Sequence, residues 1–230
     1  MKPSISKEIN INYLVKARHR GQDPLLFLDM RAGRRYVLKN SKDLSVLNLF
    51  SYTCGIGLCA VKGEAKEVWN IDFAKSSLEI GQENAQINQI TGENFKLIKE
   101  DVFGALYQMA GIPFKGRLAK RKPEVKLKEK NFDLVFLDPP PWSKGHFGTV
   151  DLIRDYQSIF KPALMVTAPG GRIIAVNNVG QVNLNDWIEI LKRCAIKAGK
   201  PIKEIEIIQP EDDFPSWDKN HPLKIAVCQL

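Results

Sequence analysis

Residues 46–57, VLNLFSYTCGIG, decide the fold that the sequence predicts. The apolar residues at 46–50 are typical of a strand buried on both faces. The polar and glycine residues that follow suit a tight turn, which brings backbone N–H groups close to a ligand before a short helix begins at about Leu58. Nucleotide-binding α/β units begin in this way, but glycines also serve turns that bind nothing, so the rest of the chain has to decide between the two interpretations.

The same alternation of strand, turn and helix continues to the end of the chain. Strands are predicted at 67–71, 95–99, 132–137, 172–176, 202–208 and 223–228, and helices at 75–88, 102–110, 150–167 and 184–198. Alternating units of this kind predict a Rossmann-like α/β fold, with a mostly parallel seven-stranded sheet and helices on both faces. The last two strands have no helix between them, so we expect one antiparallel strand near the edge.

The first 40 residues are predicted to form a small extension on the main domain, which spans 41–230. Apolar residues at helical spacing predict an amphipathic helix over 5–20. Short strands are predicted at 25–29 and 36–38, on either side of a charged turn at 30–35.

The positive charge is concentrated in two segments. The net charge of the chain is +8, while residues 1–40 and the insertion at 115–130 each carry +6, so the remainder carries −4. This distribution favours a polyanionic partner held outside an acidic body, although lysine-rich loops also serve solubility alone. In the insertion, the predicted RNA-binding residues are Lys120, Arg121, Lys122, Lys126 and Lys128.

Several classes of protein are excluded by what the sequence lacks. It has no apolar run long enough to cross a membrane and no apolar signal-peptide core at its start, so we expect a soluble, cytoplasmic protein with no membrane partner. Four cysteines without a CxxC pair argue against a disulfide framework or a structural zinc site. We expect no bound metal.

Three carboxylates stand at the ends of successive predicted strands. In such a sheet a ligand lies across the carboxyl ends of the strands, where the strand order reverses. Asp72 is placed to accept hydrogen bonds from ribose hydroxyls, Asp101 with the Val102 N–H to contact an adenine edge, and Asp138 to face the substrate. Each of them is also a possible helix cap.

The turn at 50–57 lacks the patterns that bind phosphates. Neither GxxxxGK[ST] nor GxGxxG is present, so a nucleoside cofactor without phosphates fits better than a nucleotide. S-adenosylmethionine is such a ligand.

The stretch Asp138 to Trp142, DPPPW, is the most specific local signal. Consecutive prolines fix φ near −65° and remove backbone donors, which makes a stiff bracket with acceptors facing outward. Asp138 and a nearby carbonyl are suited to hold a base, and Trp142 to stack on it. The alternative is a rigid turn with a buried tryptophan.

Six stretches together resemble the class I S-adenosylmethionine-dependent methyltransferases of large-subunit ribosomal RNA. They are LLFLDMRAGRR, LNLFSYTCGIG, IDFAKSSLEIGQENAQIN, EDVF, FDLVFLDPPPWSK and GGRIIAVNNVG, from about Leu25 onward. The nearest likeness is to the guanine-N7 module of methyltransferase K/L, and a more distant one is to the cytosine-C5 methyltransferase I family. The chain departs from the family pattern at Cys54, Ala74 and Trp142.

The resemblance implies a set of site residues and two partners. The predicted cofactor-binding residues are Phe27, Asp29, Arg31, Asn48, Phe50, Ser51, Tyr52, Gly55, Gly57, Asp72, Phe73, Asp101, Val102 and Asp138. The predicted catalytic residues are Asp138, Pro139, Pro140, Trp142 and Asn177. S-adenosylmethionine is the implied cofactor, and ribosomal RNA or a ribosome assembly intermediate is the implied partner.

The target atom follows from where the cysteines stand. Methylation of cytosine C5 needs a cysteine thiolate beside the base, which C5 relatives carry after the fifth strand. This chain has Asn177 and Asn178 there, which resembles the K-type pattern, and the predicted reaction is in-line transfer to a guanine nitrogen, with N7 favoured. An exocyclic amine target, a cytosine-C5 enzyme with an unexpected cysteine, and an inactive RNA-binding protein of the same fold stay open.

Overall fold

The computed structural model describes residues 3–16, 24–218 and 220–230. Within these ranges a seven-stranded sheet forms the centre, in the order β10-β11-β9-β6-β3-β4-β5. Its strands are β3 (Ser45–Leu49), β4 (Glu67–Asp72), β5 (Phe95–Lys99), β6 (Phe132–Leu137), β9 (Thr167–Asn177), β10 (Glu204–Ile208) and β11 (Lys224–Gln229). β11 runs opposite to the other six strands and pairs antiparallel with β10 and β9, while the remaining pairs are parallel. The predicted fold class is therefore confirmed.

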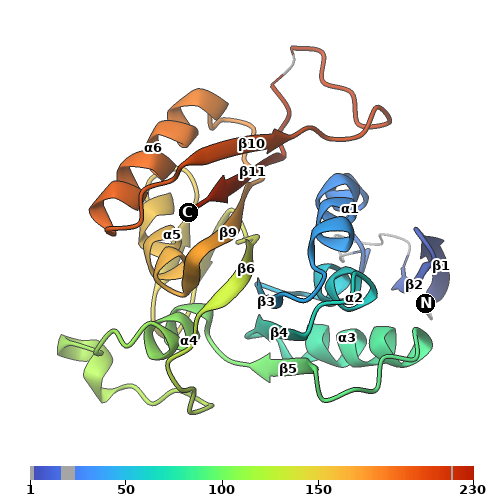
Figure 1. Cartoon of the computed structure of the whole chain (residues 1–230), viewed down its shortest axis with the longest axis horizontal. Helices are drawn as coiled ribbons and strands as arrows, with labels where there is room; N and C mark the ends of the chain where they lie inside the picture. Colours follow the sequence, from blue (N-terminus) through green and yellow to red (C-terminus); the bar gives the residue numbers. More distant parts are fainter. Residues whose placement is uncertain (1–2, 17–23, 219) are drawn as a thin grey trace.

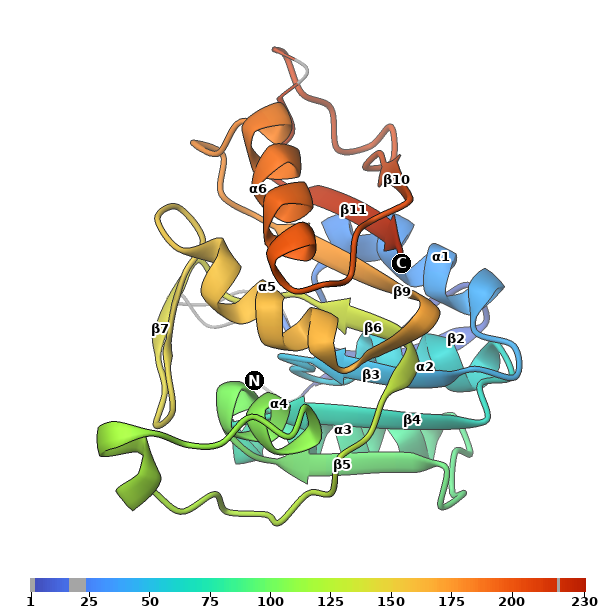
Figure 2. The ribbon, with the colours of Figure 1, turned by 60° about the vertical axis from the view of Figure 1, so that its left-hand side comes forward.

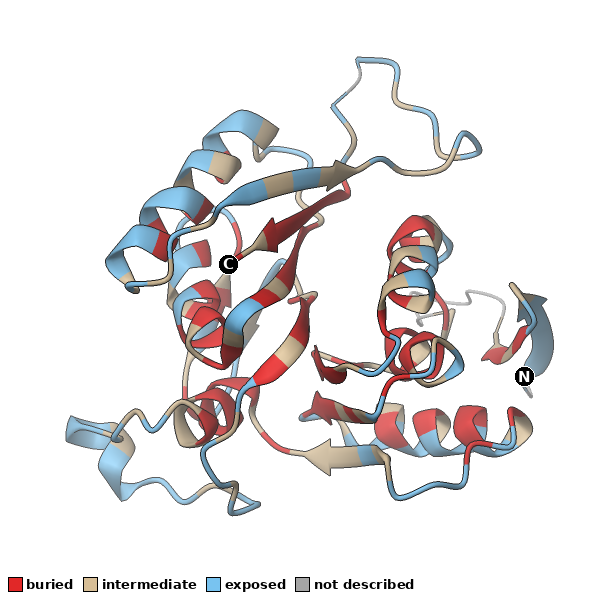
Figure 3. Cartoon of the chain, viewed as in Figure 1, coloured by how far each residue is buried: buried red, intermediate tan, exposed pale blue. Residues whose placement is uncertain are grey.

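Helices cover both faces of the sheet (Figure 1). One face carries α1 (Arg31–Asn40), α2 (Gly55–Lys62) and α3 (Lys75–Ile87), and the other carries α4 (Val102–Met109), α5 (Tyr156–Met165) and α6 (Leu184–Lys197). Two clusters of buried apolar side chains lie between the layers, and the central strands are buried on both sides (Figure 3). No helix in the described ranges is both long and apolar enough to cross a membrane.

The strand order reverses beside β3. From β3 the chain moves outward to β4 and β5, and then crosses back to pair β6 with the other side of β3. The loops after β3 and β6 therefore diverge at the carboxyl edge of the sheet and leave a crevice between them, where ligands of such folds bind.

The predicted helix over 5–20 is wrong for its described part, which is a β-hairpin. Strand β1 (Ser4–Glu8) pairs antiparallel with β2 (Ile11–Val15). Ile9 and Asn10 form the turn with φ of 51° and 61°, the left-handed geometry of a two-residue hairpin loop. Two asparagine side chains hold β2 in place. The Leu14 N–H group donates to Asn84 in the last turn of α3, and the Asn12 N–H group donates to Asn88 just after that helix, both at 2.8 Å. Residues 17–20 lie outside the described residues.

The predicted strands at 25–29 and 36–38 are also wrong, because residues 24–27 form an irregular segment and 28–40 are helical. A short 3-10 turn, η1 (Leu28–Met30), leads into α1. The residues of α1 that face the core recur at helical spacing, and this packing decides the structure. The extension therefore consists of a hairpin followed by a helix, the reverse of the predicted order, and its boundary at residue 40 stays a prediction.

The helix predicted over 150–167 begins at Tyr156, six residues later than predicted. A small hairpin, β7 (Trp142–Lys144) and β8 (Thr149–Asp151), comes first. The Asp151 carboxylate then accepts hydrogen bonds from the N–H groups of Ile153 and Arg154 at 3.1 and 3.0 Å, which holds a turn before α5. The insertion at 115–130 contains one 3-10 turn, η2 (Gly116–Lys120).

A buried ion pair ties the hairpin to the rest of the domain. Arg34 of α1 is 2% exposed, and its Nε and Nη2 atoms each lie 2.7 Å from a carboxylate oxygen of Glu8. Its Nη1 atom donates to the Phe27 carbonyl at 2.7 Å. The guanidinium therefore joins the end of β1, the helix α1 and the segment that leads to the crevice.

We expect Glu8→Ala to lower the free energy of unfolding by about 3 kcal/mol, because it leaves the Arg34 charge buried without its partner. Urea denaturation of both proteins measures this difference. The exposed neighbour provides the control, since Lys7→Ala should change stability by less than about 0.5 kcal/mol. Equal effects of the two substitutions would contradict the assigned role of the pair.

Candidate active site

A cavity of about 690 Å³ opens at the carboxyl ends of β3 and β6. Thirteen of the predicted site residues line it: Phe27, Asp29, Asn48, Phe50, Ser51, Tyr52, Gly55, Asp72, Phe73, Asp138, Pro139, Pro140 and Trp142. Other lining residues did not figure in the prediction, among them Leu25, Arg34, Thr53, Ser77, Asn178 and Leu223. The volume is typical of a site for a cofactor-sized ligand.

The loop after β3 is held by the Asp72 carboxylate. One oxygen of Asp72 accepts from the Tyr52 N–H and the other from the Ala74 N–H, both at 2.8 Å. Three alternate residues of the loop, Phe50, Tyr52 and Cys54, have φ between 49° and 65°, which costs energy for residues other than glycine. Burial raises the pKa of Asp72, although these backbone donors oppose the shift.

A second set of contacts fixes the loop from outside. The Tyr52 hydroxyl accepts from the Leu25 N–H at 3.1 Å, and the Thr53 hydroxyl donates to the Leu25 carbonyl at 2.7 Å. The rings of Phe27 and Tyr52 pack with centroids 5.5 Å apart. The segment before η1 therefore forms one wall of the cavity.

Gly57 lies behind the cavity and not in it. A Cβ atom added at Gly57 would lie 2.0 Å from Oδ1 of Asn70, whose side chain also accepts from Asn48 at 2.9 Å. Gly57 was predicted to bind the cofactor. In the structure it allows close packing between α2 and β4. The backbone approach is what requires glycine here.

Asp101 and Val102 lie outside the main cavity, in a small neighbouring hollow of about 40 Å³. Asp101 caps α4 by accepting from the N–H groups of Phe103 and Gly104 at 2.9 and 3.2 Å, and its other oxygen accepts from the Phe147 N–H at 3.1 Å. Phe50 and Phe73 line both spaces, so the hollow adjoins the cavity.

Asp138 differs from the other two strand-end carboxylates. No residue that the structure describes donates a hydrogen bond to it, whereas Asp72 and Asp101 are both fully engaged in backbone contacts. Burial, with a smaller contribution from the nearby charge of Asp29, raises its pKa from 3.8 to about 7. It is the strand-end carboxylate left for a ligand.

Arg31, which was predicted to contact the cofactor, is not a lining residue of the cavity. Arg34 is one. Arg31 forms an ion pair with Asp213 and lies 5.8 Å from the ring of Phe214. The sequence signal for Arg34 was its position three residues further along RAGRR, on the same side of a helix. The prediction of a charged turn over 30–35 concealed that spacing.

The two asparagines at the end of β9, Asn177 and Asn178, have different roles. Asn177 is fully buried, donates to the Leu152 carbonyl at 3.3 Å and accepts from the Val179 N–H at 3.0 Å. Asn178 lines the cavity, and its buried Oδ1 atom has no hydrogen-bond partner among the described residues. The side chain available to a ligand is therefore that of Asn178, one residue after the predicted one.

None of the four cysteines lines the cavity. All four are buried, and burial raises the pKa of each thiol, to about 12 for Cys54 and Cys228 and to about 11 for Cys59. A nucleophilic cysteine needs a lowered pKa and access to its substrate. These thiols have neither.

The charge of the cavity fits a cation. Asp29, Asp72 and Asp138 line it, and Arg34, the one cationic residue among the described residues that line it, is already paired with Glu8. Such a space disfavours phosphates and favours a positively charged ligand with apolar and ribose parts. S-adenosylmethionine has a sulfonium and an ammonium group, so the residues present fit it.

The chain belongs to the family of S-adenosylmethionine-dependent methyltransferases, whose profile matches residues 8–228. The predicted cofactor, S-adenosylmethionine, is confirmed. Among solved structures, a methyltransferase complexed with S-adenosylhomocysteine has the same fold, with a TM-score of 0.80 at 22% identity over 100% of this chain and 56% of that one.

Two curated relatives are named for ribosomal RNA. Ribosomal RNA large subunit methyltransferase I of Aeromonas salmonicida is 30% identical over 213 residues, which cover 93% of this chain and 50% of the relative. Ribosomal RNA large subunit methyltransferase K/L of Allochromatium vinosum is 34% identical over 165 residues, which cover 71% of this chain and 20% of the relative. The chain therefore spans half or less of the length of these relatives.

We expect Asp138→Asn to stabilise the cofactor-free protein at pH 8 but not at pH 4. The carboxyl has a raised pKa in the folded state, so the wild type loses stability as pH rises from about 4 to about 7, and the amide does not titrate. The gain at pH 8 should be on the order of 4 kcal/mol, measured by thermal unfolding across the pH range.

Asp133 provides a control of opposite sign. Burial alone would raise its pKa, but hydrogen bonds from Ser45 and the charge of Lys66 lower it overall. Asp133→Asn should therefore destabilise the protein at pH 8 and lose that effect in acid. A stability gain for Asp138→Asn that is the same at both pH values would contradict the assignment.

Proposed function

We propose that this chain methylates a guanine in large-subunit ribosomal RNA, at N7, by direct in-line transfer. The observation that carries the proposal is the pairing of an unengaged carboxylate, Asp138, with a cavity that no cysteine lines. The names of both relatives support the class of RNA substrate. On this proposal the partner is ribosomal RNA or an assembly intermediate, and the compartment is the cytoplasm.

The chemistry of N7 suits the groups that line the cavity. When bound, S-adenosylmethionine would supply a sulfonium methyl group. A nitrogen lone pair would form the new N–C bond to that methyl carbon as the C–S bond breaks, and the electrons of the C–S bond would stay on the sulfur that leaves as a thioether. Guanine N7 has a free lone pair, so the protein has to remove no proton there. The methylated base is cationic, and the carboxylate of Asp138 is placed to stabilise that charge as it develops.

Asn178 is the residue that we assign to the target base. Its Oδ1 atom has no partner among the described residues, and Asn178 lines the same cavity as Pro139, Pro140 and Trp142. A buried acceptor without a donor costs about 1–3 kcal/mol, which a ligand N–H group would recover. The N1–H and N2–H₂ groups of guanine are donors of this kind, and the proline bracket fixes the backbone beside them.

The cytosine-C5 alternative would need a thiolate beside the base. Cys54 belongs to the loop after β3, and its Sγ atom is turned toward Gly81. A Cβ atom added at Gly81 would lie 2.6 Å from this Sγ atom. Its thiol is directed into the protein, and its pKa is raised. The structure therefore supports the non-covalent reaction over the C5 mechanism.

Mass spectrometry of nucleosides tests the proposed function. Purified protein, S-adenosylmethionine and ribosomal RNA stripped of its modifications should yield 7-methylguanosine. Release of 5-methylcytidine, or a covalent adduct with RNA containing 5-fluorocytidine, would establish the C5 alternative. Calorimetry that detects no S-adenosylmethionine binding would instead support an inactive RNA-binding protein.

We expect Asn178→Ala to lower kcat/KM for RNA by about tenfold or more, with unchanged S-adenosylmethionine affinity and no loss of stability. Asn177→Ala is the matched comparison, because Asn177 is buried and bonded within the protein, and its loss should lower the melting temperature. Steady-state kinetics and thermal unfolding distinguish the two residues. Full activity of the Asn178 variant would refute its contact with the base.

A further inference from the structure

The hairpin β7–β8 and the insertion at 115–130 are joined into one surface. Phe147, near the hairpin tip, is 3% exposed, and its ring centroid lies 4.8 Å from that of Phe114 at the start of the insertion. Phe114 stacks in turn on Tyr107 of α4 at 5.8 Å. Figure 2 shows the hairpin running from the start of α5 to the insertion.

The hairpin tip is held rigidly against the domain. The Phe147 N–H group donates to Asp101 at 3.1 Å, and the Gly145 N–H group donates to the Gly148 carbonyl at 2.8 Å. A Cβ atom at Gly145 would lie 2.1 Å from the Asp101 carboxylate. The tip is therefore a fixed element whose approach requires glycine, and its outer face has a defined position.

The two faces of the hairpin differ in exposure. Ser143 pairs with the buried Val150 on the inner face, whereas Trp142 and Lys144, two residues apart on β7, project from the outer face. Trp142 is 63% exposed and also lines the cavity. The outer face thus presents an aromatic ring at the cavity mouth with an exposed cation beyond it.

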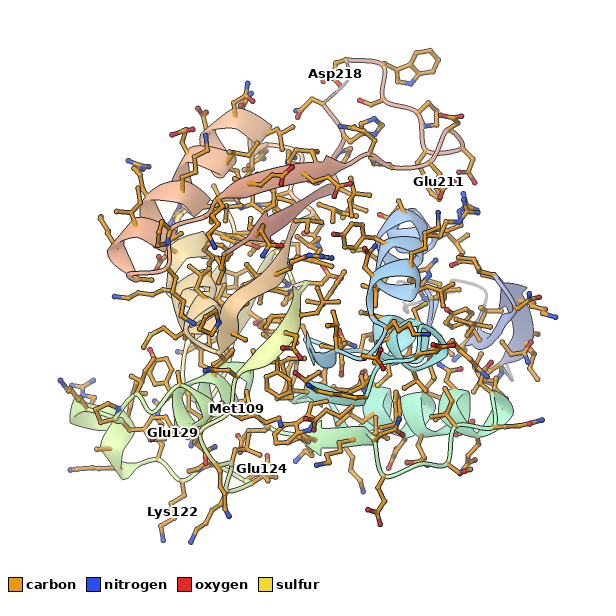
Figure 4. The ribbon with its side chains drawn as sticks, viewed as in Figure 1. Met109, Lys122, Glu124, Glu129, Glu211 and Asp218 are labelled. Atoms are coloured by element: carbon orange, nitrogen blue, oxygen red, sulfur yellow. The ribbon has the colours of Figure 1, made fainter. Side chains whose placement is uncertain are left out.

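The insertion continues this surface with positive charge. Its backbone is fixed to the domain, because Gln108 bonds to Val125 and Leu127 at 3.1 and 3.0 Å and Glu100 accepts from the Val125 N–H at 2.9 Å. Seven of its basic side chains form no ion pair among the described residues: Lys115, Arg117, Lys120, Arg121, Lys122, Lys126 and Lys128. Lys122 projects away from the body of the molecule (Figure 4).

The charge changes sign on the far side of the molecule. The loop between β10 and β11 carries four carboxylates, Glu211, Asp212, Asp213 and Asp218, and Figure 4 shows Glu211 and Asp218 at the end opposite to Lys122. Two of them are paired with arginines of α1. A polyanion is therefore attracted to the insertion side more strongly than to the loop side.

We propose that the outer face of β7–β8 and the insertion form one continuous track for single-stranded RNA, which leads the target nucleotide past Trp142 into the cavity. The strand is single because the base has to leave its stack to enter a cavity of this kind. Exposed aromatic rings interleaved with cations are the features that bind unpaired strands without regard to sequence. This inference rests on the proposed RNA substrate.

Fluorescence anisotropy with labelled oligouridine tests the track in the presence of S-adenosylmethionine. We expect Lys144→Glu, and separately the pair Lys120→Glu and Lys122→Glu, to weaken binding by roughly tenfold. For single strands, removing the cation that neutralises one phosphate should reduce the slope of log K against log salt by about 0.7. Trp142→Ala should weaken binding while leaving that slope unchanged, because it removes stacking and not charge.

The control is Arg193→Glu on α6, an exposed residue remote from the insertion, which should leave binding unchanged. A duplex RNA of equal charge distinguishes the kind of strand. Duplex affinity that equals or exceeds that of oligouridine, or unchanged affinity of the Lys144→Glu protein, would overturn the track.

Failure of the track and failure of the proposed function give different results. If the wild type methylates RNA but the hairpin and insertion variants methylate it with unchanged KM, the track is wrong and the function stands. If the wild type yields no methylated nucleoside although the variants lose RNA affinity, the function is wrong and the RNA surface stands. Thermal unfolding, measured on every variant, confirms that each protein is folded.

Discussion

The carboxylate of Asp72 is the contact on which the site depends. It joins the loop after β3 to the start of α3 through the N–H groups of Tyr52 and Ala74. Phe50, Tyr52 and Cys54 adopt left-handed backbone conformations in that loop, which persist only because surrounding bonds impose them. Without this anchor, the loop would relax and the cavity would have no wall on that side.

The three strand-end carboxylates have two kinds of role: two of them hold the backbone, and the third is left to contact a ligand. Asp72 and Asp101 are occupied by backbone donors, so their charges are compensated within the fold. Asp138 has no such donor. Burial and the neighbouring charge of Asp29 therefore raise its pKa without opposition. Sites often retain such destabilising groups, because a charge already satisfied by the protein has less to offer a ligand.

The N-terminal segment contributes contacts that shape the site. The Arg34–Glu8 pair connects β1 to α1, and the contacts of Leu25 with Tyr52 and Thr53 connect the segment between them to the cofactor loop. The hairpin residues Ile11 and Tyr13 share a buried cluster with α2 and the central strands. Folding of these first residues therefore shapes the cavity directly.

The sequence by itself determined the alternating core and the chemistry at its carboxyl edge, because buried parallel strands such as β3 and β6 are continuous apolar runs and strand-end residues meet at one edge. Only the tertiary structure decided the segments whose partners are distant in sequence. β2 is a strand because Asn84 of α3 and Asn88 just after it hold its backbone, and α1 is a helix because its buried face has a core to pack against. Likewise, only packing shows that Asn178 lines the cavity while Asn177 bonds within the protein, since neighbouring residues of an extended chain point in opposite directions. Arg31 and Arg34 lie on one side of α1, and only the position of the helix against the sheet decides that Arg34 lines the cavity while Arg31 pairs with Asp213.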